Sequence, residues 1–205
     1  MEKILADHPD LKKAVEFHGH LCPGLTIGYR ASQAALKRLG AERAQDEEVI
    51  AIVHTDACGV DALQVMLGCT LGKGNLIFKD YGKQVYIIGN RETGKAVRVA
   101  LRPDPAAANP EQTRLRNLVF GGEATPEQEK EFGKLQQERT QQLLQGADEE
   151  LFMIKEINLE LPGEAKIFAS VVCHDCGEAV MEARAHLREG QPVCPECYQE
   201  YTRGW

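Results

Sequence analysis

Four cysteines near the C-terminus have the spacing of a metal site. They form two Cys-x-x-Cys pairs separated by 17 residues: Cys173 with Cys176, and Cys194 with Cys197. Zn²⁺ takes four thiolates in a tetrahedron at about 2.3 Å, so two short loops of this kind can enclose one ion. Two disulfide bonds are the alternative, but such pairs in a chain without a secretory signal are more often metal or redox sites. A closed tetrahedron has no open position for a substrate, so we expect a structural zinc.

A second group of ligand-type residues lies near the N-terminus. His18, His20 and Cys22 fall within five residues, and Cys58 is a more distant candidate partner. Imidazole and thiolate groups bind soft transition metals, and this set could hold one while leaving a coordination position open. Asp61, one turn into the helix that follows Cys58, could orient a histidine or move a proton, which makes it a catalytic candidate.

Cys22 and Cys58 each stand immediately before a predicted helix. The free N–H groups and the dipole of a helix N-terminus stabilise an anion, so both residues are candidates for reactive, catalytic thiolates. In the alternative interpretation, His18 and His20 only cap the C-terminus of a helix, and the cysteines are small buried apolar side chains.

A glycine-rich loop at 68–74 contains one candidate contact for a cofactor. The pattern Gly-x-x-x-Gly-Lys-Gly differs from a phosphate-binding loop in its spacing and has no Ser or Thr after Lys73, which argues against a nucleoside triphosphate site. Backbone N–H groups and Lys73 could still bind a smaller anion or the phosphate of a cofactor. We expect Cys69, in the same loop, to be an inert buried side chain.

The elements that must position these residues are both helices and strands, which the spacing of the apolar residues predicts. We expect helices at 3–17, 23–39, 61–67 and about 110–147, and strands at 49–53, 76–79, 84–88, 96–101 and 152–157. Strands that follow one another this closely predict an antiparallel meander. The predicted fold class is therefore α+β, with helices packed on an antiparallel sheet.

The C-terminal cysteines predict a small domain of their own. Gly177 suits the tight turn of a zinc knuckle, Glu-Gly-Gln at 189–191 predicts a hairpin turn, and Pro195 favours a helix that starts at the second pair. A knuckle, a hairpin and a ligand-bearing helix together describe a treble-clef zinc finger. We therefore expect a core domain at 1–165 and the finger at 166–205.

Composition and charge restrict the functions open to the chain. Its 205 residues are 43% hydrophobic, which is enough for one core of moderate size and a small appendage that needs metal to fold. No apolar run is long enough to span a membrane, and the N-terminus lacks the pattern of a signal peptide, so we expect a cytoplasmic protein with reduced thiols. The formal net charge of -7 argues against binding to nucleic-acid phosphates.

The chain resembles the family named for the E-type subunit of formylmethanofuran dehydrogenase. The matching residues span most of the core and the whole finger: Phe17-His18-Gly19-His20-x-Cys22-Pro23-Gly24 with Gly28 and Arg30, then Cys58-x-x-Asp61-Ala62-Leu63-Gln64 through Gly68-Cys69-Thr70-x-Gly72-Lys73-Gly74-Asn75-Leu76, and the terminal zinc finger. The resemblance implies an α+β core with a treble-clef finger, intertwined dimers, and a metal-binding cleft. The residues of that cleft would be His18, His20, Cys22 and Cys58.

The family name also implies partners and a pathway. Formylmethanofuran dehydrogenases carry a molybdenum or tungsten pterin and reduce CO₂ onto methanofuran in methanogenesis, although many members of the family occur outside methanogens. The resemblance therefore implies a homodimeric accessory subunit or cofactor-handling factor of such a redox enzyme, with zinc or another transition metal in the core. Whether the chain itself is an enzyme stays open. The alternative, from another class, is a zinc-finger interaction module without catalytic activity.

Overall fold

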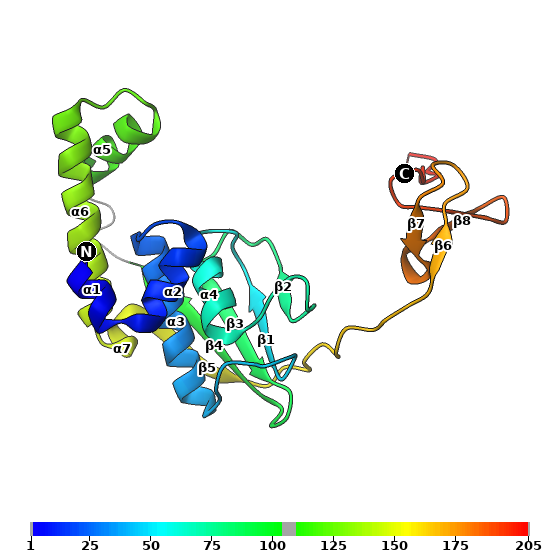
Figure 1. Ribbon diagram of the computed structural model, residues 1–205, viewed down its shortest axis with the longest axis horizontal. Helices are drawn as coiled ribbons and strands as arrows, with labels where there is room; N and C mark the ends of the chain where they lie inside the picture. The colour runs from blue at the N-terminus through cyan, green and yellow to red at the C-terminus, as the bar shows by residue number, and fades with distance from the viewer. Residues whose placement is uncertain (1, 104–109, 205) are drawn as a thin grey trace. The chain divides into compact units, whose positions relative to one another are not determined.

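The computed structural model of the protein describes residues 2–103 and 110–204 (Figure 1). The chain divides into two compact units, Met1–Glu164 and Ala165–Trp205. The larger unit contains a sheet with helices packed on it, and the smaller unit contains two short hairpins and the four finger cysteines. Within the described residues, no helix is both long enough and apolar enough to cross a membrane.

A five-stranded sheet forms the centre of the larger unit. Its strands are, in spatial order, β2 (Leu76–Phe78), β1 (Val49–Val53), β3 (Val85–Asn90), β4 (Lys95–Leu101) and β5 (Phe152–Ile157). The pairs from β1 to β5 are antiparallel, as expected, whereas β2 pairs parallel with β1. The prediction of a simple meander was wrong at this edge, because the helix between β1 and β2 acts as a crossover that returns the chain in the same direction.

Helices α2, α3 and α4 lie over one face of the sheet (Figure 1). The N-terminal helices are α1 (Glu2–Asp7), α2 (Pro9–His18), α3 (Pro23–Leu39) and α4 (Gly59–Leu67). The single helix expected at 3–17 is divided at His8, because Pro9 has no N–H to continue a helix and restricts the residue before it. α3 ends at Gly40, whose left-handed φ of 60° is the usual helix stop.

A helical segment follows β4 and packs against the end of α3. Its members are α5 (Pro110–Phe120), α6 (Pro126–Gln145) and α7 (Asp148–Leu151). Thr125 and Gln128 form a capping box at the start of α6. At the other end, Arg30 of α3 donates to the carbonyl oxygens of Leu144 and Gly146, which satisfies carbonyls that the helix itself leaves unpaired.

The smaller unit contains two hairpins and, between them, the short 3-10 helix η2 (Glu182–Arg184). The hairpins are β6 (Ser170–Val172) with β7 (Ala179–Met181), and β8 (His186–Arg188) with β9 (Gln191–Val193). Glu189 and Gly190 join β8 to β9 with φ values of 53° and 79°, which a tight two-residue hairpin turn requires. The helix expected after the second cysteine pair is not formed: 195–197 is a turn, and 198–204 has no regular structure. A helix this short is not stable by local preference alone, and while Tyr198 packs against the cysteine cluster, Tyr201 is 84% exposed.

Candidate metal centre

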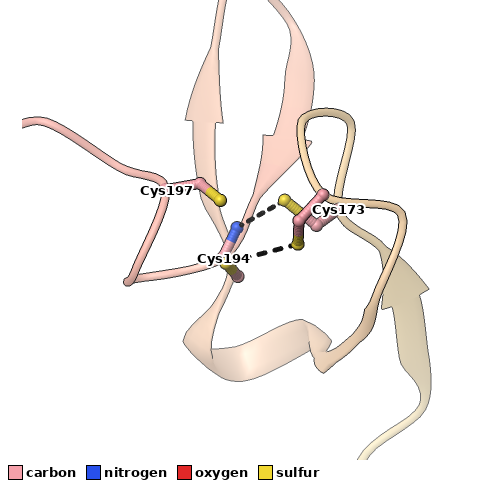
Figure 2. Close-up of side chains that lie close together, drawn as sticks. Cys173, Cys194 and Cys197 are labelled. Atoms are coloured by element: carbon pink, nitrogen blue, oxygen red, sulfur yellow. Dashed lines mark hydrogen bonds between the residues drawn. The ribbon is translucent and has the colours of Figure 1, made fainter.

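The four finger cysteines converge on one point, as their spacing predicts. Their sulfur atoms all lie within 4.8 Å of one another. The sulfurs of Cys176 and Cys194 are 4.0 Å apart, close to the edge of about 3.8 Å that a tetrahedron with Zn–S bonds of about 2.3 Å would have. Figure 2 shows Cys173, Cys194 and Cys197 with the hydrogen bond, 3.2 Å long, that Cys194 N–H donates to Cys173 Sγ. The donor set and its size therefore fit Zn²⁺.

Backbone N–H groups favour the thiolate at Cys173, whereas hydrogen bonding with Cys194 raises the pKa of the Cys197 thiol to about 12. Hydrogen bonds from the backbone of Cys176 and Cys194 lower the pKa of the Cys173 thiol to about 6. Since only the thiolate binds the metal, part of the cost of deprotonation is already met by the fold. The imidazole ring of His186 stacks on Tyr198, with ring centroids 4.1 Å apart.

The second cluster forms where α2 ends and α3 begins. Gly19, with φ of 95°, ends α2 directly after His18, and Cys22 caps the N-terminus of α3. The connection between the helices is so short that ligand atoms of His18, His20 and Cys22 all lie within 4.8 Å of one another. Nε2 of His18 is 3.9 Å from the Cys22 sulfur, and the two imidazole centroids are 4.6 Å apart. These three residues are thus brought together as the sequence predicts.

Asp61 of α4 reaches the same cluster from the other side. Its Oδ2 lies 2.7 Å from His18 Nδ1, and the His18 side chain is only 12% exposed. This contact places the proton on Nδ1 and leaves Nε2, the nitrogen nearer Cys22, as a ligand. Gln64, one turn further along α4, donates to the second carboxylate oxygen of Asp61 at 3.2 Å. Gln64 was not among the predicted site residues, although its spacing of three from Asp61 on a helix could have indicated the pair.

Cys58 lies beside this cluster but is not one of the group of three. A Cβ atom built on Gly24 would be 3.6 Å from Cys58 Sγ and 3.8 Å from Cys22 Sγ, so the two sulfurs are neighbours. Cys22 accepts a hydrogen bond from Leu25 N–H at 3.3 Å, as its N-terminal position predicts. However, burial is the larger effect and, together with the charge of Cys58, raises the pKa of the Cys22 thiol. The N–H groups of the helix N-terminus thus favour the thiolate at Cys22, as expected, but desolvation outweighs them.

The glycine-rich loop does not join the cluster. The ammonium group of Lys73 donates to the carbonyl oxygen of Asp46 at 2.6 Å, and its backbone N–H donates to Thr70 Oγ1. These are contacts within the fold, so a role of Lys73 in binding a cofactor stays a prediction. Cys69 has no exposed surface, and burial raises the pKa of its thiol to about 12, which agrees with an inert side chain.

Fold and sites together define an α+β metal-binding protein with a separate C-terminal zinc finger. A family model described as "FmdE, Molybdenum formylmethanofuran dehydrogenase operon" matches residues 17–153, and the model of the prokaryotic dksA/traR C4-type zinc finger matches 166–203. The first match covers more than half of the chain. The chain therefore belongs to the FmdE family, which confirms the resemblance that the sequence motifs indicate.

Two relatives extend this comparison. A probable S-adenosyl-L-methionine-binding protein of Archaeoglobus fulgidus is 32% identical over 198 residues, which are 93% of this chain and 53% of the relative. The chain thus spans about half the length of that protein. The crystal structure of a tungsten formylmethanofuran dehydrogenase FmdE-like protein from Syntrophus aciditrophicus aligns with a TM-score of 0.60 and 24% identity, over 91% of this chain and 89% of that one. This second likeness supports the fold.

Proposed function

We propose that the core cluster binds a transition metal ion through His18, His20 and Cys22, in addition to a structural zinc in the finger. The observation that carries this proposal is the fixed orientation of His18, whose Nδ1 contacts Asp61 at 2.7 Å while Nε2 faces the Cys22 sulfur. A ligand histidine that donates its other N–H to a carboxylate is the usual arrangement in protein metal sites.

Three protein ligands would leave a position for a small molecule at a four-coordinate ion. A bound zinc or similar ion would supply Lewis acidity to a molecule at that position. The chain itself would fix the histidine tautomer through Asp61, which can also hold a proton next to the site. Cys58, whose sulfur borders the same Gly24 position as that of Cys22, would serve as a fourth ligand or as a separate thiol. Asp61 would thus take part in catalysis through its proton, Cys22 as a metal ligand, and Cys58 as a ligand or a free thiol.

We further propose that the protein serves a molybdenum or tungsten redox enzyme, as an accessory subunit or as a factor that handles its pterin cofactor, and that it does so as a homodimer. Support comes from the family description, which names the operon of the molybdenum formylmethanofuran dehydrogenase. The open position expected at the core metal suits a protein that handles a ligand or cofactor. The alternative is an interaction module, in which the finger binds a protein partner and the core cluster is only structural.

Metal analysis of purified full-length protein separates these functions. After metal removal and reloading with Zn²⁺, we expect more than one metal ion per chain in the wild type. Cys22→Ser and His20→Ala should each lose the excess while the finger zinc and the far-ultraviolet circular dichroism are retained. Cys69→Ala and His8→Ala are matched controls outside the cluster and should bind as the wild type does. One zinc per chain in every variant would favour the interaction module.

A further inference from the structure

Two thiols of the core unit lie near each other, and only Cys22 belongs to the group of three ligands proposed above. Cys22 caps the N-terminus of α3 and Cys58 precedes α4. Both side chains are partly exposed, and the position of a Cβ atom on Gly24 lies within 3.8 Å of both sulfurs. The pair is therefore accessible to small molecules and close in space although the two residues are far apart in the sequence.

Glycines hold the two helix N-termini at this distance. A Cβ atom on Gly28 would lie 2.0 Å from the carbonyl oxygen of Gly59, so the backbones of α3 and α4 touch directly at this crossing. A Cβ atom on Gly59 would likewise meet the hydroxyl of Tyr86 at 2.4 Å and the carbonyl oxygen of Gly24 at 3.1 Å. No side chain can separate the helices here, so the residues that begin them must remain neighbours.

We propose that Cys22 and Cys58 form a reversible disulfide bond, and that this bond and the core metal exclude each other. The second half of this statement rests on the proposed function, because Cys22 supplies a metal ligand only as a thiolate. A sulfur atom in a disulfide has no thiolate to offer, so the oxidised protein would have only two of the three ligands. The site would then lose its metal under oxidising conditions and regain it after reduction.

The chemistry needs a two-electron oxidant, for which hydrogen peroxide is the simplest class. One thiolate attacks the peroxide O–O bond, which gives a sulfenic acid and releases hydroxide that is protonated to water. The second thiolate then attacks that sulfur, the S–S bond forms, and the S–O bond breaks with loss of a second water. Overall, two thiols lose two electrons and two protons, and one peroxide becomes two waters.

The other cysteines of the chain provide internal controls. Cys69 has no exposed surface, and its sulfur donates to the carbonyl oxygen of Val49 at 3.3 Å. We therefore expect it to stay reduced in the folded protein. The peptides of the finger are followed separately, because zinc-bound thiolates can still react with peroxide.

The experiment uses full-length protein with zinc retained in the finger and the core metal removed. It is treated with hydrogen peroxide at neutral pH, and free thiols are then blocked before digestion with trypsin and mass spectrometry. Because Cys58 and Cys69 share one tryptic segment, the digestion is repeated on Cys69→Ala. We expect a linked peptide that joins Cys22 to Cys58, its disappearance after dithiothreitol, and its absence from Cys22→Ser and Cys58→Ser.

The outcomes test separately whether the disulfide bond forms and whether it excludes the core metal. Sulfinic acid at either residue without a linked peptide, or a link to Cys69, would overturn the proposal. If the bond forms, the oxidised and the re-reduced proteins are compared for binding of Zn²⁺ beyond the finger ion. Equal binding of excess Zn²⁺ in both proteins would overturn the mutual exclusion of disulfide and metal. No excess binding in either would show that the proposed metal function has failed, while the disulfide stands.

Discussion

His18 shows how a single side chain can be made ready for a metal by its neighbours. Its ring is held between Asp61 at 2.7 Å and the Cys22 sulfur at 3.9 Å, and Gln64 holds the far oxygen of the carboxylate. The proton on Nδ1 and the direction of Nε2 are thereby fixed before any metal arrives. Pre-orientation of this kind lowers the cost of assembling the site, because the imidazole need not be reoriented on binding.

Loss of the carboxylate should weaken metal binding at the core without removing a ligand. For Asp61→Ala we expect the affinity of the core site for Zn²⁺ to fall by about 10- to 100-fold, as for other residues that orient ligand histidines. A smaller loss is expected for Asp61→Asn, whose amide oxygen can still accept from Nδ1. Competition with a chromophoric chelator measures both affinities. Asp10→Ala, which removes an exposed carboxylate that accepts a hydrogen bond from Lys13, is the control. An unchanged affinity in Asp61→Ala would contradict the orienting role.

His54 predicts a pH dependence of stability. Its Nδ1 is buried without a hydrogen-bond partner among the residues that the structure describes, and its ring packs edge-on against Tyr81. Burial, with the charges of Arg98 and Lys83 next, lowers the pKa of His54 in the folded protein. The unfolded chain therefore binds the proton more readily, so this contribution to stability is fully present above about pH 6.5 and is lost as the pH falls.

Urea unfolding of the wild type and of His54→Phe measures this effect between pH 5 and pH 8. The aromatic replacement keeps a ring against Tyr81 but has no site for a proton. We expect the variant to lose less stability on acidification than the wild type does. Above about pH 6.5, the free energies of unfolding of the two proteins should change with pH at the same rate. Parallel curves throughout the range would show that His54 does not contribute.

At the scale of elements, the crossing of α3 and α4 determines where the site is. Cys22 comes from one helix N-terminus, and Cys58 and Asp61 come from the other. The close contact between Gly28 and Gly59 sets the distance between the two helices. A sequence pattern indicates each helix separately, but the approach of their backbones follows from packing against the sheet. The geometry of the site therefore depends on this contact between the two glycines.

Gly28→Ala should disturb this crossing. The added methyl group would meet the Gly59 carbonyl at 2.0 Å, and backbone atoms cannot move aside as a flexible side chain could. We expect a loss of about 1–3 kcal/mol in the free energy of unfolding, or more if the helices cannot separate, and weaker binding of the core metal. Gly133→Ala is the matched control, since nothing lies within 4 Å of its added methyl group in α6.

That control should be neutral or stabilising by about 0.5–1 kcal/mol, because alanine favours the helix interior and restricts the unfolded chain. Chemical denaturation measures both variants. Equal stabilities for Gly28→Ala and Gly133→Ala would show that the contact between α3 and α4 is not restrictive.

At the scale of the whole molecule, the two units are stabilised in different ways. The larger unit has a continuous buried core that joins the sheet to α3 and α4, with Ile88, Val97 and Leu63 among its fully buried members. The buried cluster of the finger consists of Cys173, Val193 and Cys194. A cluster of that size cannot offset the entropy of ordering the finger, so we expect its fold to depend on the metal.

Removal of zinc should therefore unfold one unit and leave the other folded. Hydrogen exchange measured by mass spectrometry, before and after treatment with a strong chelator, should show loss of protection across 170–197 and retained protection in β1, β3 and β4. Readdition of Zn²⁺ should restore the first region. Retained protection in the finger after complete metal removal would contradict a metal-dependent fold.

The amino-acid sequence by itself determined most of the elements and the composition of both ligand groups. Periodicity and breakers located α3 and β1, because Pro23, Gly40 and the apolar run 49–53 act through local backbone preferences. The Cys-x-x-Cys spacing likewise defined the finger site within short loops. The helix expected to start at the second cysteine pair did not form, because local preference alone does not stabilise so short a helix.

Only the tertiary structure decided the parallel pairing of β2, the neighbouring sulfurs of Cys22 and Cys58, and the contact of Asp61 with His18. These depend on how elements far apart in the sequence approach each other, and that approach is set by burial and backbone contact that no local pattern encodes. The raised pKa of the Cys22 thiol has the same origin. Its helix N-terminus was visible in the sequence, but the desolvation that outweighs it exists only once α3 and α4 are packed together.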